Sequence, residues 1–127
     1  MAGGAAVKIK LQLYCGEEIA MGPGKADLLD AIRAHGSISA AGRAMDMSYR
    51  RAWQLVDVMN RCWAQPLVET SPGSARNGGG ARVTPAGEAM LAHYRALQAH
   101  LAQAAGGPDH AALAAAILPS PRPPRRG

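Results

Sequence analysis

The sequence predicts a mainly α-helical domain with a small β-wing, the architecture of a winged helix-turn-helix. Three observations predict it: two short helical patterns joined over a tight turn, two short apolar stretches around a glycine-rich loop, and one long helical pattern after that loop. The length of 127 residues suits one compact domain. Because 48% of the residues are apolar and none is Phe, closely approaching helices are favoured over a thick aromatic core.

The N-terminal segment is expected to form a β-hairpin. Residues 7–14 alternate between apolar and polar side chains, a period of two that predicts a half-buried strand, and residues 19–21 are a candidate return strand. Gly22-Pro23-Gly24 then reads as a break in regular structure. From Lys25 the apolar spacing becomes helical and ends at His35, where Gly36 suits the left-handed position that closes many helices.

Residues 37–63 predict two helices joined by a tight turn. A short helix over 40–45 would be capped by Ser39, and a longer one over 49–62 would be capped by Ser48. Two helices that cross steeply over a three-residue turn need small side chains at the crossing. Ala40, Ala41 and Ala44 supply them, and the inner face of the second helix carries Ala52, Leu55, Val56 and Met59.

A wing and a long helix follow. Strands at 67–70 and 81–84 would flank the glycine-rich loop, and Thr84 would cap a helix that runs to about residue 105. We therefore expect a winged helix-turn-helix domain over residues 1–105. Residues 106–127 would hold a short alanine-rich helix and a disordered tail of Pro and Arg.

The placement of charge points to double-stranded DNA. The formal net charge is +5, and residues 33–82 hold seven arginines against three acids. A helix can enter the major groove while a wing follows phosphates or the minor groove. Arg50 or Arg51 would then read guanine, Gln54 would pair with adenine, and Trp53 is expected mainly to pack, with a DNA contact as the alternative. The predicted DNA-contacting residues are Ser39, Ser48, Tyr49, Arg50, Arg51, Trp53, Gln54, Ser74, Arg76, Asn77, Gly78, Gly79 and Arg82.

Other functional classes find little support. The four histidines match no metal-ligand spacing, and no Lys-Ser/Thr follows Gly78–Gly80 as a phosphate-binding loop requires. Cys15 and Cys62 form no CxxC pair, and Cys62 is expected to be an inert thiol, with a redox role as the alternative. No apolar run is long enough to cross a membrane, and no signal peptide is visible. We expect a cytoplasmic, non-enzymatic protein without a cofactor or a membrane partner.

The motifs between residues 36 and 91 resemble the N-terminal winged-helix domain of the molybdate-responsive ModE regulators, which is similar to the LysR-type DNA-binding domain. They are GSIS, SYRRAW, LVET, the glycine-rich loop and VTPAG. The resemblance covers residues 7–105 and implies a dimeric DNA-binding transcriptional regulator. It implies that Ser48, Tyr49, Arg50 and Arg51 open the recognition helix and that residues 76–80 form the wing. It also implies a dimer made by the last long helix, with the N-terminal segment as a further candidate contributor.

The chain departs from that family in one respect. Full-length ModE regulators continue into small β-barrel modules that bind molybdate or tungstate, whereas this sequence ends at Gly127 after its Pro/Arg tail. The expectation is a regulator of molybdenum-related genes without the molybdate-binding domain. No cofactor is predicted, and molybdate is the alternative. The alternative is a small oxyanion-binding or adaptor protein that keeps the fold.

Overall fold

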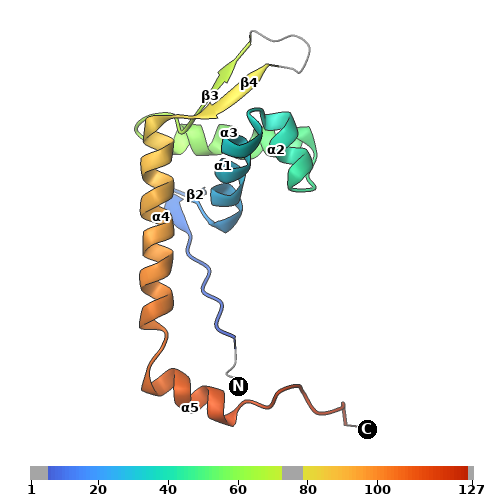
Figure 1. Cartoon of the computed structure of the whole chain (residues 1–127), viewed down its shortest axis with the longest axis vertical. Coiled ribbons are helices and arrows are strands. Elements are labelled where there is room, and N and C mark those ends of the chain that lie inside the picture. Colours follow the sequence, from blue (N-terminus) through green and yellow to red (C-terminus); the bar gives the residue numbers. More distant parts are fainter. Residues whose placement is uncertain (1–5, 73–78, 126–127) are drawn as a thin grey trace. The chain divides into compact units, whose positions relative to one another are not determined.

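The computed structural model describes residues 6–72 and 79–125, and it confirms a mainly helical fold with small β-hairpins (Figure 1). Contacts divide the chain into two units: Lys10–Ala96, and the residues before Lys10 together with those after Ala96. The domain boundary predicted at residue 105 stays a prediction. The elements in order are β1 (Leu13–Cys15), β2 (Glu18–Met21), α1 (Pro23–His35), α2 (Ile38–Ala44), α3 (Tyr49–Cys62), β3 (Val68–Ser71), β4 (Gly80–Val83), α4 (Pro85–Ala104) and α5 (Pro108–Ala116).

One hydrophobic core holds the unit Lys10–Ala96 together. The apolar faces predicted for α1 and α3 are confirmed as buried, and residues of α2, the wing strands and the first half of α4 complete this core. The buried side chains of α1 and α3 are Ala26, Leu28, Leu29, Ile32, Ala52, Val56 and Met59.

The expected N-terminal hairpin is confirmed, but the half-buried strand expected over residues 7–14 is wrong in its extent, because the first strand covers only Leu13–Cys15. Only β1 pairs with β2, antiparallel, and the register shifts between Leu13 and Tyr14. Val7, Ile9 and Leu13 are exposed, and only Leu11 packs against the core. The alternating pattern predicts which side chains share a face, but it does not predict whether another layer of the fold covers that face.

The start of α1 also differs from its prediction. The sequence predicts a break in regular structure at Gly22-Pro23-Gly24, yet Pro23 is the first residue of α1. Proline is tolerated there because the first N–H groups of a helix have no intrahelical acceptor. The predicted end is confirmed, since Gly36 adopts φ 77° and its N–H donates to the Ile32 carbonyl at 2.8 Å.

The helix-turn-helix is formed by α2 and α3. The cap predicted at Ser48 is confirmed, because its Oγ accepts from the Arg51 N–H at 3.0 Å. The cap predicted at Ser39 is wrong: Ser37 Oγ accepts from the Ala40 N–H at 3.0 Å, while Ser39 Oγ accepts from the Arg43 guanidinium. Starting α2 two residues earlier brings Ile38 inside the helix, where its side chain is buried.

The α2–α3 crossing depends on a residue absent from the sequence prediction. A Cβ added to Gly42 would lie 3.2 Å from the Ala52 Cβ, so the two helices leave little room for a side chain at Gly42. Ala41 is buried beside it, but Ala44 is exposed and Ala40 is only partly buried. The prediction of small side chains at the crossing is confirmed for Ala41 and wrong for Ala44.

The predicted wing and the cap of α4 are confirmed. β3 and β4 pair antiparallel, from Val68 opposite Val83 to Ser71 opposite Gly80. Thr84 Oγ1 accepts from the Gly87 N–H at 3.0 Å and donates to the Pro66 carbonyl at 2.7 Å. The backbone of α4 approaches the wing so closely that a Cβ on Gly87 would lie 2.3 Å from the Leu67 carbonyl oxygen.

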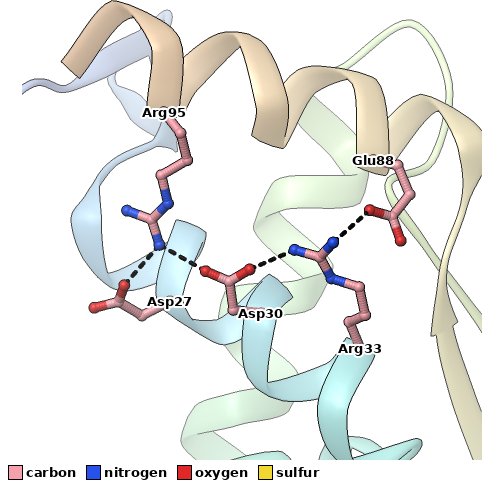
Figure 2. Close-up of polar contacts among 5 residues, drawn as sticks. All are labelled: Asp27, Asp30, Arg33, Glu88 and Arg95. Carbon is pink, nitrogen blue, oxygen red and sulfur yellow. Dashed lines mark hydrogen bonds and ion pairs between the residues drawn. The ribbon is translucent and has the colours of Figure 1, made fainter. Parts of the chain in front are cut away.

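Ion pairs join α1 to the first half of α4, as Figure 2 shows. Arg95 contacts Asp27 at 2.9 Å and Asp30 at 2.8 Å. Asp30 also contacts Arg33 at 2.6 Å, and Arg33 reaches Glu88 at 3.2 Å. The four pairs form one continuous network, which fixes α1 beside α4 by charge as well as by apolar packing.

In the second unit, α4 continues to Ala104 and α5 follows after Gly107, whose φ is 122°. α5 has no buried residue, and Leu97, Leu113, Ile117 and Leu118 are exposed. Within the described parts of the chain, no helix is both long and apolar enough to cross a membrane.

Candidate nucleic-acid interface

The first two turns of α3 present three separate surfaces. Successive helical residues lie about 100° apart, so side chains four residues apart share a side. Tyr49 and Trp53 lie on one side, Arg50 and Gln54 lie on the next, and Arg51 and Leu55 lie on the third. All of them except Leu55 are exposed. The sequence therefore places five exposed polar or aromatic side chains where α3 begins.

The surface of α3 toward the wing is hollowed. Tyr49 and Trp53 line a cavity of about 230 Å³ together with Ser37, Ile38, Ser39, Thr70, Ser71, Pro72, Gly79 and Gly80. Trp53 Nε1 donates to the Tyr49 hydroxyl. Trp53 is 37% exposed and is absent from the core, so its interpretation as a packing residue is wrong. Its apolar ring instead forms one wall of this aromatic hollow, beside the hydroxyl groups of α2 and β3.

Arg50 and Gln54 form the outer face of α3. Within residues 6–72 and 79–125, neither side chain has an ion pair or hydrogen bond. A guanidinium and an amide one turn apart, both without partners, can each make two parallel hydrogen bonds to a base edge. This face can therefore make direct contact with bases in a major groove.

Arg51 lies on the side of α3 opposite the aromatic hollow. It lines a second cavity, of about 350 Å³, together with Lys10 and Lys25. The structure thus distinguishes two arginines that the sequence left equivalent: Arg50 lies on the outer face, whereas Arg51 lies beside other cations.

Of the wing residues predicted to contact DNA, the structure describes Gly79 and Arg82. Arg82 pairs with Glu69 across the two strands at 2.6 Å, and both side chains stay largely exposed. A Cβ on Gly79, whose φ is 85°, would lie 2.3 Å from the Ser71 carbonyl oxygen, so glycine is required there to close the hairpin. Ser74, Arg76, Asn77 and Gly78 lie outside the described residues.

Asn60 positions the wing, and the sequence prediction missed it. Its Oδ1 accepts from the N–H groups of Leu67 and Val68 at 2.9 and 3.1 Å, and its Nδ2 donates to the Val68 carbonyl at 3.0 Å. The amide thereby ties the start of β3 to the last turn of α3. An asparagine near the end of an apolar helical face, shortly before a strand, is the signal that would have found it.

Metal and thiol chemistry has little support in this structure. In the described parts of the chain, no group of three or more His, Cys, Asp or Glu side chains is placed to hold a metal ion. Cys15 and Cys62 are both free thiols. Burial raises the pKa of the Cys62 thiol, and its hydrogen bond with Cys15 raises it further, so Cys62 is held in its protonated, less nucleophilic form.

Comparison with known proteins agrees with this geometry. Residues 25–88 match the model of the bacterial regulatory helix-turn-helix proteins of the lysR family, a stretch that contains α1 to β4 and the start of α4. The chain belongs to this family. Its helix-turn-helix domain is of the kind that DNA-binding transcription regulators carry, and the family is one of regulators rather than enzymes.

The most similar relatives confirm the resemblance to ModE regulators. The molybdenum-pterin-binding protein MopA of Rhodobacter capsulatus is 47% identical over 79 residues, which are 62% of this chain and 29% of MopA. The molybdenum transport protein ModE of Azotobacter vinelandii is 42% identical over 71 residues (56% and 26%). The DNA-binding transcriptional dual regulator ModE of Escherichia coli K12 is 33% identical over 87 residues (68% and 33%). The chain spans about three tenths of the length of the first of these relatives.

A solved structure confirms the fold. The DNA-binding domain of CbnR, in complex with DNA, aligns with a TM-score of 0.51 and 18% identity, covering 72% of this chain and 95% of that domain. This likeness confirms the winged helix-turn-helix fold formed by α1, α2, α3 and the wing.

Proposed function

We propose that this protein is a sequence-specific, homodimeric transcription regulator that binds double-stranded DNA and controls molybdenum-related genes. The observation that carries the proposal is the outer face of α3, where Arg50 and Gln54 are exposed, adjacent and without partners within residues 6–72 and 79–125. Membership of the lysR helix-turn-helix family and the ModE relatives support it.

In this proposal α3 lies in the major groove. Arg50 makes a bidentate contact with the O6 and N7 atoms of guanine, and Gln54 contacts an adenine one helical turn further along α3. The exposed hydroxyl of Tyr49 and the start of α3 at Ser48 contact phosphates, which fix the register of the helix without reading sequence.

The dimer in this proposal is formed by the second half of α4 and by α5. Leu97 is 41% exposed and Leu113 is 64% exposed, and both belong to the unit in which α5 has no buried residue. Exposed leucines on consecutive helices are typical of surfaces that pair with another protein. A two-fold dimer would present two α3 helices to half-sites about one DNA turn apart.

The test is fluorescence anisotropy with a duplex from the promoter of a molybdate-transport operon and with a scrambled duplex of equal length. We expect Arg50→Ala to weaken promoter binding by about 1–3 kcal/mol and to leave scrambled-duplex binding nearly unchanged. Arg61→Ala is the matched control, because Arg61 also lies on α3 but pairs with Asp57 near the other end of the helix.

Wild-type binding that does not distinguish the two duplexes would contradict sequence-specific regulation. Molybdate binding by the same protein, detected calorimetrically in the absence of any promoter preference, would favour the alternative of an oxyanion-binding or adaptor protein.

A further inference from the structure

Three cations from separate segments of the chain line one cavity at the start of α3. Lys10 lies in the segment before β1, Lys25 is in the first turn of α1 and Arg51 is in the first turn of α3, and all three line the cavity of about 350 Å³. We name this cavity the basic hollow. Neither the helix-turn-helix nor the wing includes Lys10 or Lys25, so the proposed interface does not account for them.

The positive charge of the basic hollow is not compensated. No ion pair within 4.0 Å involves Lys10, Lys25 or Arg51 in the described part of the chain. Burial lowers the pKa of Lys25 and the charge of Arg51 lowers it further, while Cys62 and Glu18 act in the opposite direction without outweighing them. Lys25 and Arg51 therefore repel each other in the free protein, and an anion between them would relieve that repulsion.

The remaining lining is mixed, because Ile19, Met47 and Leu55 add apolar side chains beside the polar groups. Gln12 adds an amide group, and the start of α1 at Pro23 carries neither a capping side chain nor an acidic residue in its first turn. The helix dipole there reinforces the field of the two lysines. The hollow is open to solvent, so an extended polyanion can reach it.

We propose that the basic hollow binds phosphates of the DNA backbone, so that the N-terminal segment and the start of α1 form part of the DNA interface. This inference rests on the proposed function. With the outer face of α3 toward the base edges, Arg51 lies about 100° around the helix from Arg50, on the side toward a groove wall. Arg51 therefore acts with Lys10 and Lys25 on phosphate, and of the two neighbouring arginines only Arg50 reads a base.

The test is the salt dependence of DNA binding by the full chain. Each phosphate contact contributes about 0.9 to the slope of log K against log[salt]. We expect Lys25→Gln and Lys10→Gln each to flatten the slope by about 1 and to weaken promoter and scrambled duplexes by the same factor. Lys8→Gln is the matched control, since it removes the same charge two residues from Lys10, outside the residues that line the hollow.

Two further experiments locate the phosphates that the basic hollow contacts and verify that the variants fold. Phosphate-ethylation interference should show one or two backbone positions per half-site at which modification inhibits wild-type binding but not Lys25→Gln. Lys25→Arg should restore the wild-type slope, because it keeps the charge, and thermal unfolding should show that each variant folds.

The outcomes separate this inference from the proposed function. A slope unchanged in Lys25→Gln and Lys10→Gln, while Arg50→Ala still loses promoter preference, would overturn the basic hollow and leave the regulator intact. The same unchanged slopes, together with calorimetric binding of inorganic phosphate that Lys25→Gln abolishes, would assign the hollow to a free anion and overturn its DNA role. Absence of wild-type DNA binding would contradict both.

Discussion

Arg50 and Arg51 are neighbours in the sequence, but their surroundings on α3 differ. Arg50 lies beside Gln54 on the outer face, whereas Arg51 lines the basic hollow with two lysines. Chemically identical side chains thus receive different proposed partners, a base for Arg50 and a phosphate for Arg51. A sequence pattern cannot make this distinction, because both residues occupy the same exposed first turn.

Asn60 is the residue whose loss should most disturb the wing. Asn60→Ala leaves the N–H groups of Leu67 and Val68 and the Val68 carbonyl without their partner, and both of these residues are buried. We expect a loss of about 1–3 kcal/mol in the free energy of unfolding, measured by urea denaturation. Gln54→Ala removes an exposed amide from the same helix and should change stability by less than about 0.5 kcal/mol. Equal effects of the two variants would refute the positioning role of Asn60.

At the scale of elements, the contact between α4 and the wing tolerates no side chain at Gly87. Gly87→Ala places a methyl group against the Leu67 carbonyl oxygen and the Val83 side chain. Because the obstacle includes backbone, we expect a cost of about 1–3 kcal/mol. The control is Gly24→Ala in the first turn of α1, where no atom lies within 4 Å of the added Cβ. That substitution should be neutral or stabilising, and destabilisation equal to that of Gly87→Ala would contradict the packing argument.

The network between α1 and α4 should make stability depend on acid. Burial alone would raise the pKa of Asp30, but hydrogen bonds from Arg95 and Arg33 outweigh it and hold this pKa below its usual value of 3.8. A carboxylate with a lowered pKa stabilises the fold above pH 3.8, and this contribution is lost as the pH falls through its folded-state pKa.

We therefore expect Asp30→Asn to lower stability at pH 6 and to match the wild type more closely at pH 2. Because the Asp30 side chain is 43% exposed, the difference at pH 6 should be only about 0.5–1 kcal/mol. Urea denaturation at both pH values measures it. The same deficit at pH 2 as at pH 6 would show that Asp30 contributes through packing rather than through its charge.

At the scale of the whole molecule, the sequence predicts those elements whose partners are close in the chain. Local periodicity and turn chemistry predict α2, α3, the wing and the caps at Gly36, Ser48 and Thr84. Contacts between distant segments are not encoded in such patterns. The hydrogen bond from the Tyr94 hydroxyl to the Leu11 carbonyl and that from Trp63 Nε1 to the Ala20 carbonyl are of this kind.

Within the candidate site, too, the sequence predicts the residues that share one element and misses those that distant segments bring together. Its residues on α3 are visible in the sequence because they share one helix. The basic hollow is not, since Lys10, Lys25 and Arg51 belong to separate segments of the chain that only the tertiary fold brings together. The ion pair between Arg82 and Glu69 in the wing could not be predicted from the sequence either, because it depends on the register of β3 against β4.

The homodimer is the prediction that belongs to the whole chain. Sedimentation equilibrium should give twice the chain mass of 13.2 kDa. Leu97→Glu, which places a charge in the proposed apolar interface, should shift the equilibrium toward monomer and reduce promoter affinity. Ala92→Glu adds the same charge at an exposed position in the first half of α4 and should leave the dimer intact. A wild-type monomer at tens of micromolar protein would contradict the proposed assembly.

The most direct test of sequence reading by α3 is selection of bound duplexes from a random pool, followed by sequencing. The wild type should enrich a two-fold symmetric motif with half-sites about 10 base pairs apart. Arg50→Ala should lose the preference at one position of each half-site, while Lys25→Gln should enrich the same motif with lower yield. No enriched motif, or an Arg50→Ala motif identical to that of the wild type, would contradict the account.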